Sequence, residues 1–167
     1  MTPLLKPIAD SFRTTNFVLE LCLGDLNDND AKHRSRDGDG PSIAWQVGHM
    51  LDFRYTALRL IGVARESPYH AKYSLTRASD GSDYPDVTTY GRVWKELNAE
   101  LEKALEAAAP ESLECLVEDR VYGTRTVLES LAFVTWHEAY HMGALAAIRK
   151  QLGYPGPAEL TLARVAI

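Results

Sequence analysis

Residues 126–152 read TVLESLAFVTWHEAYHMGALAAIRKQL, and this stretch has the pattern of one long amphipathic helix. Thr126-Val-Leu-Glu129 has the spacing of a capping box, which predicts that the helix begins there. Gly153 and Pro155 predict its end. Apolar residues recur at helical spacing and predict the face that points into a core: Leu131, Val134, Leu145, Ile148 and Leu152.

Three ionisable side chains interrupt this apolar side of the helix, namely His137, Glu138 and His141. Burying such groups without partners costs several kcal/mol, so we expect each to have one. Histidines at positions i and i+4 lie on one face of a helix, and both imidazoles can reach a single metal ion. The pattern favours a metal site over the alternative of hydrogen-bonded core histidines.

A third ligand has to come from another helix, and His49 is the candidate. It lies among Trp45, Phe53 and Leu60, which share one side of a second predicted helix. The other two histidines have different surroundings. His33 lies in a polar loop and His70 follows Pro68 in a long connection, and we expect both to be solvated.

Three further segments carry the 3.6-residue period, at about 5–26, 42–63 and 87–108. Ser42 is the expected N-cap of the second of them. The connection between the second and third helices is long enough to cross the bundle. The sequence therefore predicts an all-α four-helix bundle with a long crossover between the second and third helices. For residues 116–124 the sequence leaves a short extended ribbon and a plain loop equally open.

Composition narrows the class of protein. A chain of 167 residues with 46% hydrophobic and 25% charged residues fits a single globular domain, 1–167. The net charge of -5 gives no electrostatic basis for binding nucleic acid or an anionic membrane. The sequence has no membrane-span or signal-peptide pattern, and its two cysteines, Cys22 and Cys115, are expected to be buried or unreactive thiols. We therefore expect a cytoplasmic protein.

Two motifs resemble a known family. Thr135-Trp-His-Glu-Ala-Tyr-His-Met-Gly-Ala-Leu145, with Arg149 and Gly153, resembles the last helix of the DinB-like (damage-inducible) superfamily. Pro41-Ser-Ile-Ala-Trp-Gln-Val-Gly-His49 resembles its second-helix motif. Family members often carry Gln where this chain has Ala144, so the hydrogen bond made by that amide is absent here.

The resemblance implies a four-helix bundle, often dimeric, that holds a divalent metal ion on three histidines. For this sequence the resemblance implies the ligands His49, His137 and His141, with zinc or nickel as the metal. Some relatives are thiol-dependent enzymes, including mycothiol-dependent isomerases and bacillithiol transferases, while many members have no assigned reaction. A low-molecular-weight thiol is therefore a candidate partner.

Two other metal motifs fit less well. His137-Glu-Ala-Tyr-His141 satisfies the H-E-x-x-H pattern of zinc proteases, but no histidine follows His141, and Glu159, the only later acid, lies in a short tail. Glu138-x-x-His141 is half of a di-iron motif, and the sequence contains no second copy. We expect neither a protease nor a di-iron centre.

Three neutral nitrogen ligands would leave an open position, where the ion could activate a water or a thiol. Asp52 and Glu138 are the candidate general bases, or groups that orient an imidazole. The alternative is an ordinary exposed acid for Asp52 and a structural hydrogen bond to a neighbouring helix for Glu138.

We therefore expect a metal-dependent transferase, isomerase or hydrolase that acts on a small molecule, with a low-molecular-weight thiol as a candidate partner. The alternative is a non-catalytic metal-binding or stress-response module with a structural or sensory ion. A structural zinc ion normally has four protein ligands, so three histidines favour the enzyme.

The outward side of the last helix is also apolar or small, with Trp136, Tyr140, Gly143 and Ala147 at helical spacing. A helix that is apolar on both sides is usually covered on both. The cover is either a second copy in a two-fold dimer or another part of the same chain. The family resemblance favours the homodimer.

Overall fold

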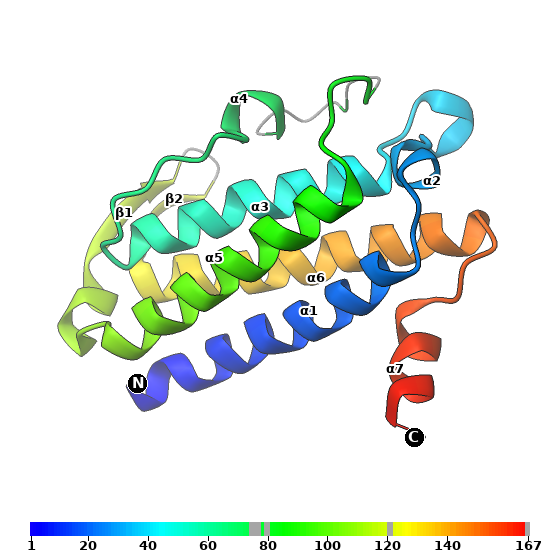
Figure 1. Cartoon of the computed structure of the whole chain (residues 1–167). Coiled ribbons are helices and arrows are strands. Elements are labelled where there is room, and N and C mark those ends of the chain that lie inside the picture. Colours follow the sequence, from blue (N-terminus) through cyan, green and yellow to red (C-terminus); the bar gives the residue numbers. More distant parts are fainter. Residues whose placement is uncertain (74–77, 79–80, 120–121, 166–167) are drawn as a thin grey trace.

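In the computed structural model, which describes residues 1–73, 78, 81–119 and 122–165, four long helices form a bundle (Figure 1). They are α1 (Lys6–Gly24), α3 (Ile43–Leu60), α5 (Val87–Ala107) and α6 (Val127–Gln151). The predicted fold class is confirmed. The shorter elements are 3-10 turns at Pro3–Leu5, Arg36–Gly38 and Pro110–Glu114, helices α2 (Asp28–Lys32), α4 (His70–Tyr73) and α7 (Pro157–Val165), and strands β1 (Leu116–Asp119) and β2 (Gly123–Thr126).

Local sequence explains where the long helices begin. The Ser42 side chain accepts a hydrogen bond from the backbone N–H of Trp45, which fixes the start of α3. Thr126 and Glu129 form the complete predicted capping box of α6. At the other end of α6, Gly153 takes a φ of 84°, the left-handed conformation that ends many helices.

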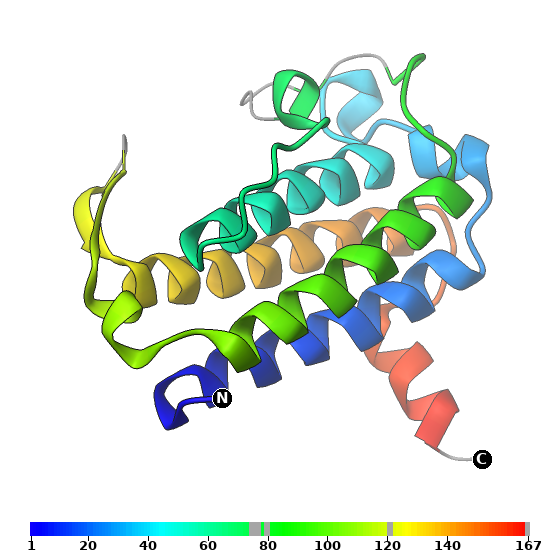
Figure 2. The same cartoon turned by 60° about the vertical axis from the view of Figure 1, so that its left-hand side comes forward.

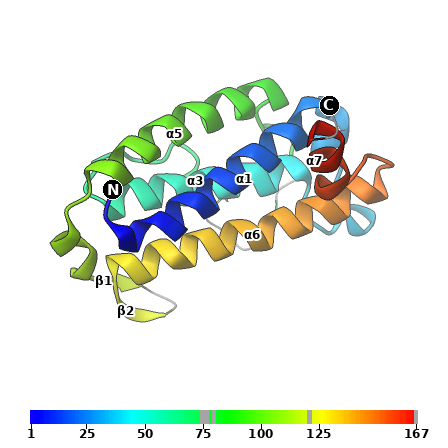
Figure 3. The same ribbon diagram turned by 90° about the horizontal axis from the view of Figure 1, so that it is seen from below.

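The order of the helices in space differs from their order in sequence. Helix α1 packs against α5 and α6, and α3 packs against the same two helices, so α1 and α3 lie diagonally across the bundle (Figures 1 and 3). Helices α3 and α5 run in the same direction, because the connection between them returns along α3 before α5 begins (Figures 1 and 2). The predicted crossover is confirmed, although residues 74–77 and 79–80 within it lie outside the described residues.

Two segments complete the molecule. Strands β1 and β2 pair antiparallel, with Leu116 opposite Thr126 and Asp119 opposite Gly123, so the segment left open by the sequence is a ribbon. Residues 120–121 at its turn are outside the described residues. The short tail after Pro155 forms helix α7, which packs on α1. None of the helices in the described part of the chain is long and apolar enough to cross a bilayer.

A buried ion pair joins the helices at the centre of the bundle. Arg54 on α3 donates through Nε and Nη2 to the two carboxylate oxygens of Glu138 on α6, and neither side chain is exposed. Its Nη1 atom donates to Asn98 Oδ1 on α5 at 2.7 Å. The guanidinium carbon lies 4.5 Å from the ring centroid of Phe12 on α1 and 4.3 Å from that of Trp94 on α5. One side chain therefore contacts residues of the three other long helices.

We expect Glu138→Gln to lower the free energy of unfolding by about 3 kcal/mol, because it leaves the Arg54 charge buried without its counter-ion. Urea denaturation followed by circular dichroism measures the change. The control is Glu96→Gln, whose partner Arg92 lies on the surface of α5. It should cost less than about 0.5 kcal/mol. Equal losses in the two variants would contradict a central role for the buried pair.

Candidate metal centre

The three predicted histidines meet between α3 and α6. His49 Nε2 lies 3.2 Å from His137 Nε2, and His141 Nε2 lies 3.0 Å from the same atom. The three candidate ligand atoms all lie within 4.8 Å of one another, and no fourth His, Cys, Asp or Glu joins this group among the described residues. The spacing of His137 and His141 by one helical turn brings both rings to the same side of α6.

The outer ring nitrogens of two of these histidines have acceptors. His49 Nδ1 lies 2.6 Å from the carbonyl oxygen of Tyr73, and a carbonyl only accepts, so Nδ1 carries the proton. His141 Nδ1 lies against Oε1 of the buried Gln46 and donates in the same way. In the neutral imidazoles the Nε2 atoms of His49 and His141 therefore hold lone pairs, and both face His137.

A cation would satisfy this arrangement of lone pairs. His137 Nε2 has two such neighbours, and one N–H donates a good hydrogen bond to only one of them. A tetrahedral site with Zn–N bonds of 2.0–2.1 Å separates its nitrogens by about 3.3 Å. Two of the three observed separations, 3.2 and 3.0 Å, are close to that value, and all three candidate ligand atoms lie within 4.8 Å of one another. The residues therefore fit a divalent ion held on three Nε2 atoms.

Burial keeps these imidazoles neutral. It lowers the pKa of His137 to about 4, with a further contribution from nearby His49. It lowers the pKa of His141 to about 3, assisted by His137 and His49. The pKa of His49 is also lowered by burial, while its hydrogen bond to Tyr73 acts in the opposite direction. At neutral pH all three residues are in the form that binds a metal ion.

Aromatic rings hold the histidines in place. Trp45 stacks on His49 with ring centroids 4.8 Å apart and planes 12° from parallel. The Phe53 ring centroid lies 3.9 Å from that of His137, and that of Phe133 lies 5.7 Å from it. His137 is the least buried of the three histidines, so the cluster is closed on the Trp45 side and less covered at His137.

The two candidate carboxylates lie away from the three imidazoles. Glu138 directs both oxygens to Arg54, in line with the structural alternative for this residue. Asp52 is 4% exposed, so it is not an ordinary surface acid, and its Oδ2 atom accepts from His70 Nδ1 at 3.1 Å. Its negative charge acts against the burial that lowers the pKa of His49, although the two side chains form no direct hydrogen bond.

The remaining histidines and the cysteines lie outside the cluster. His33 is exposed, and the His70 side chain is 67% exposed, as expected, although His70 pairs with Asp52. Cys22 is buried, and burial raises the pKa of its thiol to about 11. Cys115 is exposed.

Comparisons with known proteins agree with this fold. Residues 12–145 match the sequence profile described as the DinB superfamily. The chain belongs to the DinB superfamily. Among curated proteins, no similar sequence was found.

Two solved structures share the family fold. One is described as "YfiT from Bacillus subtilis", a probable metal-dependent hydrolase with an unusual four-helix bundle topology. It has a TM-score of 0.69 and 15% identity, over 89% of this chain and 87% of that one. A DinB-like protein from Bacillus cereus has a TM-score of 0.69 and 16% identity, over 90% and 93% of the two chains. At these identities the likeness shows the fold alone.

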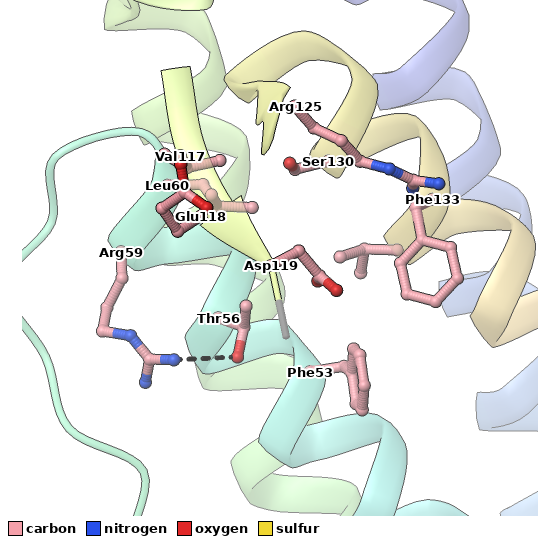
Figure 4. A pocket seen from close by; sticks show the side chains of 11 residues that line it. Phe53, Thr56, Arg59, Leu60, Val117, Glu118, Asp119, Arg125, Ser130 and Phe133 are labelled. Atoms are coloured by element: carbon pink, nitrogen blue, oxygen red, sulfur yellow. Dashed lines mark hydrogen bonds between the residues drawn. The ribbon is translucent and has the colours of Figure 1, made fainter. Parts of the chain in front are cut away.

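A cavity of about 360 Å³ lies between α3, α6 and the β1–β2 ribbon of this DinB-superfamily chain (Figure 4). Phe53 and Phe133, whose rings lie beside His137, form part of its wall. None of the three histidines lines it directly. Further walls are aliphatic, from Leu60, Val117 and Val134. The cavity therefore adjoins the side of the cluster at which His137 is less covered.

Sequence reasoning missed the groups that orient the imidazoles. Gln46 lies one turn before His49, and a buried amide on that face was an available signal. Tyr73 acts through its backbone carbonyl, which no side-chain pattern reveals. Tyr73 reaches His49 because its ring packs on Gly48, where a Cβ would overlap the ring. The Tyr73 side chain has no exposed surface, and its hydroxyl bonds that of Tyr90.

We expect Gly48→Ala to weaken metal binding about 10- to 100-fold, because the added methyl group displaces Tyr73 and removes the acceptor of His49 Nδ1. Competition with a chromogenic chelator measures the affinity. The control is Gly91→Ala on α5, where an added Cβ meets nothing within 4 Å. It should leave metal affinity unchanged. An unaltered affinity in a folded Gly48→Ala protein would refute the role of Tyr73.

Proposed function

We propose that this protein is a metal-dependent enzyme that acts on a small molecule through an open position on the His49–His137–His141 site. The observation that carries the proposal is the convergence of three Nε2 atoms without a fourth ligand group among the described residues. Catalytic zinc sites typically have three protein ligands and one open position. The adjoining cavity of about 360 Å³ is of a size that suits a small substrate.

The reaction class follows from the chemistry of such a site. A divalent ion held on three neutral nitrogens supplies Lewis-acid activation of a water or a thiol. We propose hydrolysis, or transfer or isomerisation that uses a low-molecular-weight thiol. The description of YfiT as a probable metal-dependent hydrolase supports the first of these. Cys22 is buried and protonated at neutral pH, and the exposed Cys115 lies outside both the histidine cluster and the cavity, so a thiol would come from a separate molecule.

The chain's own groups have separate roles in this proposal. Tyr73 and Gln46 hold the protons of His49 and His141 on the outer nitrogens and thereby aim both Nε2 atoms inward. Asp52, with His70, is the candidate general base because it is the carboxylate without an arginine partner. Glu138 supports the site by fixing α6 against α3 through Arg54.

The second candidate function is a non-catalytic module whose ion is structural or sensory. It would need a closed coordination shell. Neither Asp52 nor Glu138 belongs to the cluster of possible ligands, which favours the enzyme.

We expect about one equivalent of zinc or nickel per chain in untagged protein, and its loss in His137→Ala. Elemental mass spectrometry measures the metal. The control is His33→Ala, because His33 is exposed in a loop outside the cluster and should leave the content unchanged. Absence of metal in the wild type, even after dialysis against both ions, would refute the proposed three-histidine metal site.

We also propose that the protein is a homodimer. Trp136 is 59% exposed and Tyr140 62% exposed, and their rings stack with centroids 6.0 Å apart. Gly143 and Ala147 continue the same exposed face of α6. The alternative cover, another part of the same chain, is absent over these residues in the described structure. An apolar helix face with small residues at one end suits close packing against its own copy.

We expect Trp136→Glu to convert a dimer into a monomer, because the face meets itself across a two-fold axis and each interface would bury two carboxylates. Size-exclusion chromatography with light scattering measures the mass. Phe17→Glu is the matched control, since Phe17 is also exposed but lies on α1. A monomeric wild type, or dissociation by the control alone, would contradict this interface.

A cytoplasmic location completes the proposal. Both cysteines are free, and unpaired thiols are typical of reducing compartments.

A further inference from the structure

Four charged side chains line the cavity beside His137. Its rim contains two acids, Glu118 and Asp119 on β1, and two arginines, Arg59 on α3 and Arg125 on β2. Figure 4 shows Arg59 near Thr56 and Arg125 on the side of Phe133. The four formal charges sum to zero, so selectivity depends on which groups already have partners.

The two acids have donors within the ribbon itself. Glu118 Oε1 accepts from the Thr124 hydroxyl at 2.8 Å, and Asp119 Oδ1 accepts from the backbone N–H of Tyr122 at 2.8 Å. Each of these bonds engages one oxygen of its carboxylate, and both acids remain part of the cavity lining.

The two arginines have no carboxylate partner in the described part of the chain. Arg59 donates from Nη2 to the Thr56 hydroxyl at 3.0 Å. The Arg125 guanidinium lies 4.2 Å from the ring centroid of Tyr122 and 5.7 Å from that of Phe133. Stacking uses the flat face of a guanidinium and leaves the N–H groups at its edge available. Arg125 is only partly exposed, so solvent screens its charge less than that of a surface arginine.

The rest of the cavity lining is apolar apart from the hydroxyl groups of Thr56 and Ser130. Phe53 and Phe133 form the wall toward His137, and Leu60, Val117 and Val134 add aliphatic surface. A ligand that fills this space has an apolar or aromatic body with a negative group at one end. Carboxylate and phosphate both match the planar fork of an arginine.

We propose that this cavity is the substrate subsite and that it binds a small apolar or aromatic acid, with Arg125 or Arg59, which lie on opposite sides of the cavity, holding the anionic group and Phe53 and Phe133 packing on the body. The inference rests on the proposed function, because the body of the ligand then extends toward the metal centre at His137. Arg125 and Arg59 are positioning residues that select the ligand.

The test measures binding of three probes of similar size to the full chain by ligand-observed NMR: benzoate, phenyl phosphate and neutral benzyl alcohol. At least one anion should bind about tenfold or more tightly than benzyl alcohol. Arg125→Met and Arg59→Met are made separately, and at least one of them should weaken binding of the anion while leaving the affinity for benzyl alcohol unchanged. Arg92→Met, on the surface of α5 away from this cavity, is the matched control. Circular dichroism verifies that each variant is folded.

A second arm separates this subsite from the metal centre. The same titrations with His137→Ala should retain the preference for the anion, because Arg125 and Arg59 are unchanged. Retention of anion binding in a protein that holds no metal would support the subsite even if the proposed function failed. Equal binding of anions and benzyl alcohol, no binding of any probe, unchanged affinity in both cavity arginine variants, or anion binding that vanishes with His137 would each overturn the proposal.

Discussion

The buried contact between Arg54 and Glu138 is the constraint on which the rest of the structure depends. Removing two charges from water is expensive, and the cost is offset only when every donor has a partner in good geometry. Here both carboxylate oxygens, the Asn98 amide oxygen and two aromatic faces meet one guanidinium. These partners come from the three other long helices, so the contact ties α3 to α1, α5 and α6 at one point.

That constraint also bears on the geometry of the three-histidine cluster. Arg54 follows His49 along α3, and Glu138 lies directly between His137 and His141 on α6. The ion pair fixes the rotation and the sliding of α3 against α6, and the three Nε2 atoms converge as a consequence. The crossover then adds the carbonyl of Tyr73, which turns the His49 lone pair inward. A metal site requires its ligand atoms to stay within a few tenths of an ångström of their positions. The packing of α3 on α6 holds His49 Nε2 and His141 Nε2 at 3.2 and 3.0 Å from His137 Nε2.

The histidine cluster is covered on one side and lies close to a cavity on another. Trp45 closes one side of the histidine cluster, whereas Phe53 and Phe133 separate His137 from a cavity on another side. The cavity is formed by the ends of α3 and α6 together with the β1–β2 ribbon, so the bundle holds the ligands and the ribbon completes the space for a substrate. The exposed Trp136 and Tyr140 lie on the same helix, which brings a prospective dimer face close to the centre.

The sequence by itself determined the long helices, their caps, the crossover and the three converging histidines, because capping, helical periodicity and i, i+4 spacing are local properties of the chain. It also identified Glu138 and Asp52 as acids near those histidines, but not their partners. Only the tertiary structure decided that Glu138 meets Arg54, that Asp52 meets His70, and that Tyr73 and Gln46 orient the ligands. These contacts join residues distant in sequence, and one of them uses a backbone carbonyl. Periodicity gives the direction of a side chain from its own helix axis, whereas its partner depends on how the helices pack.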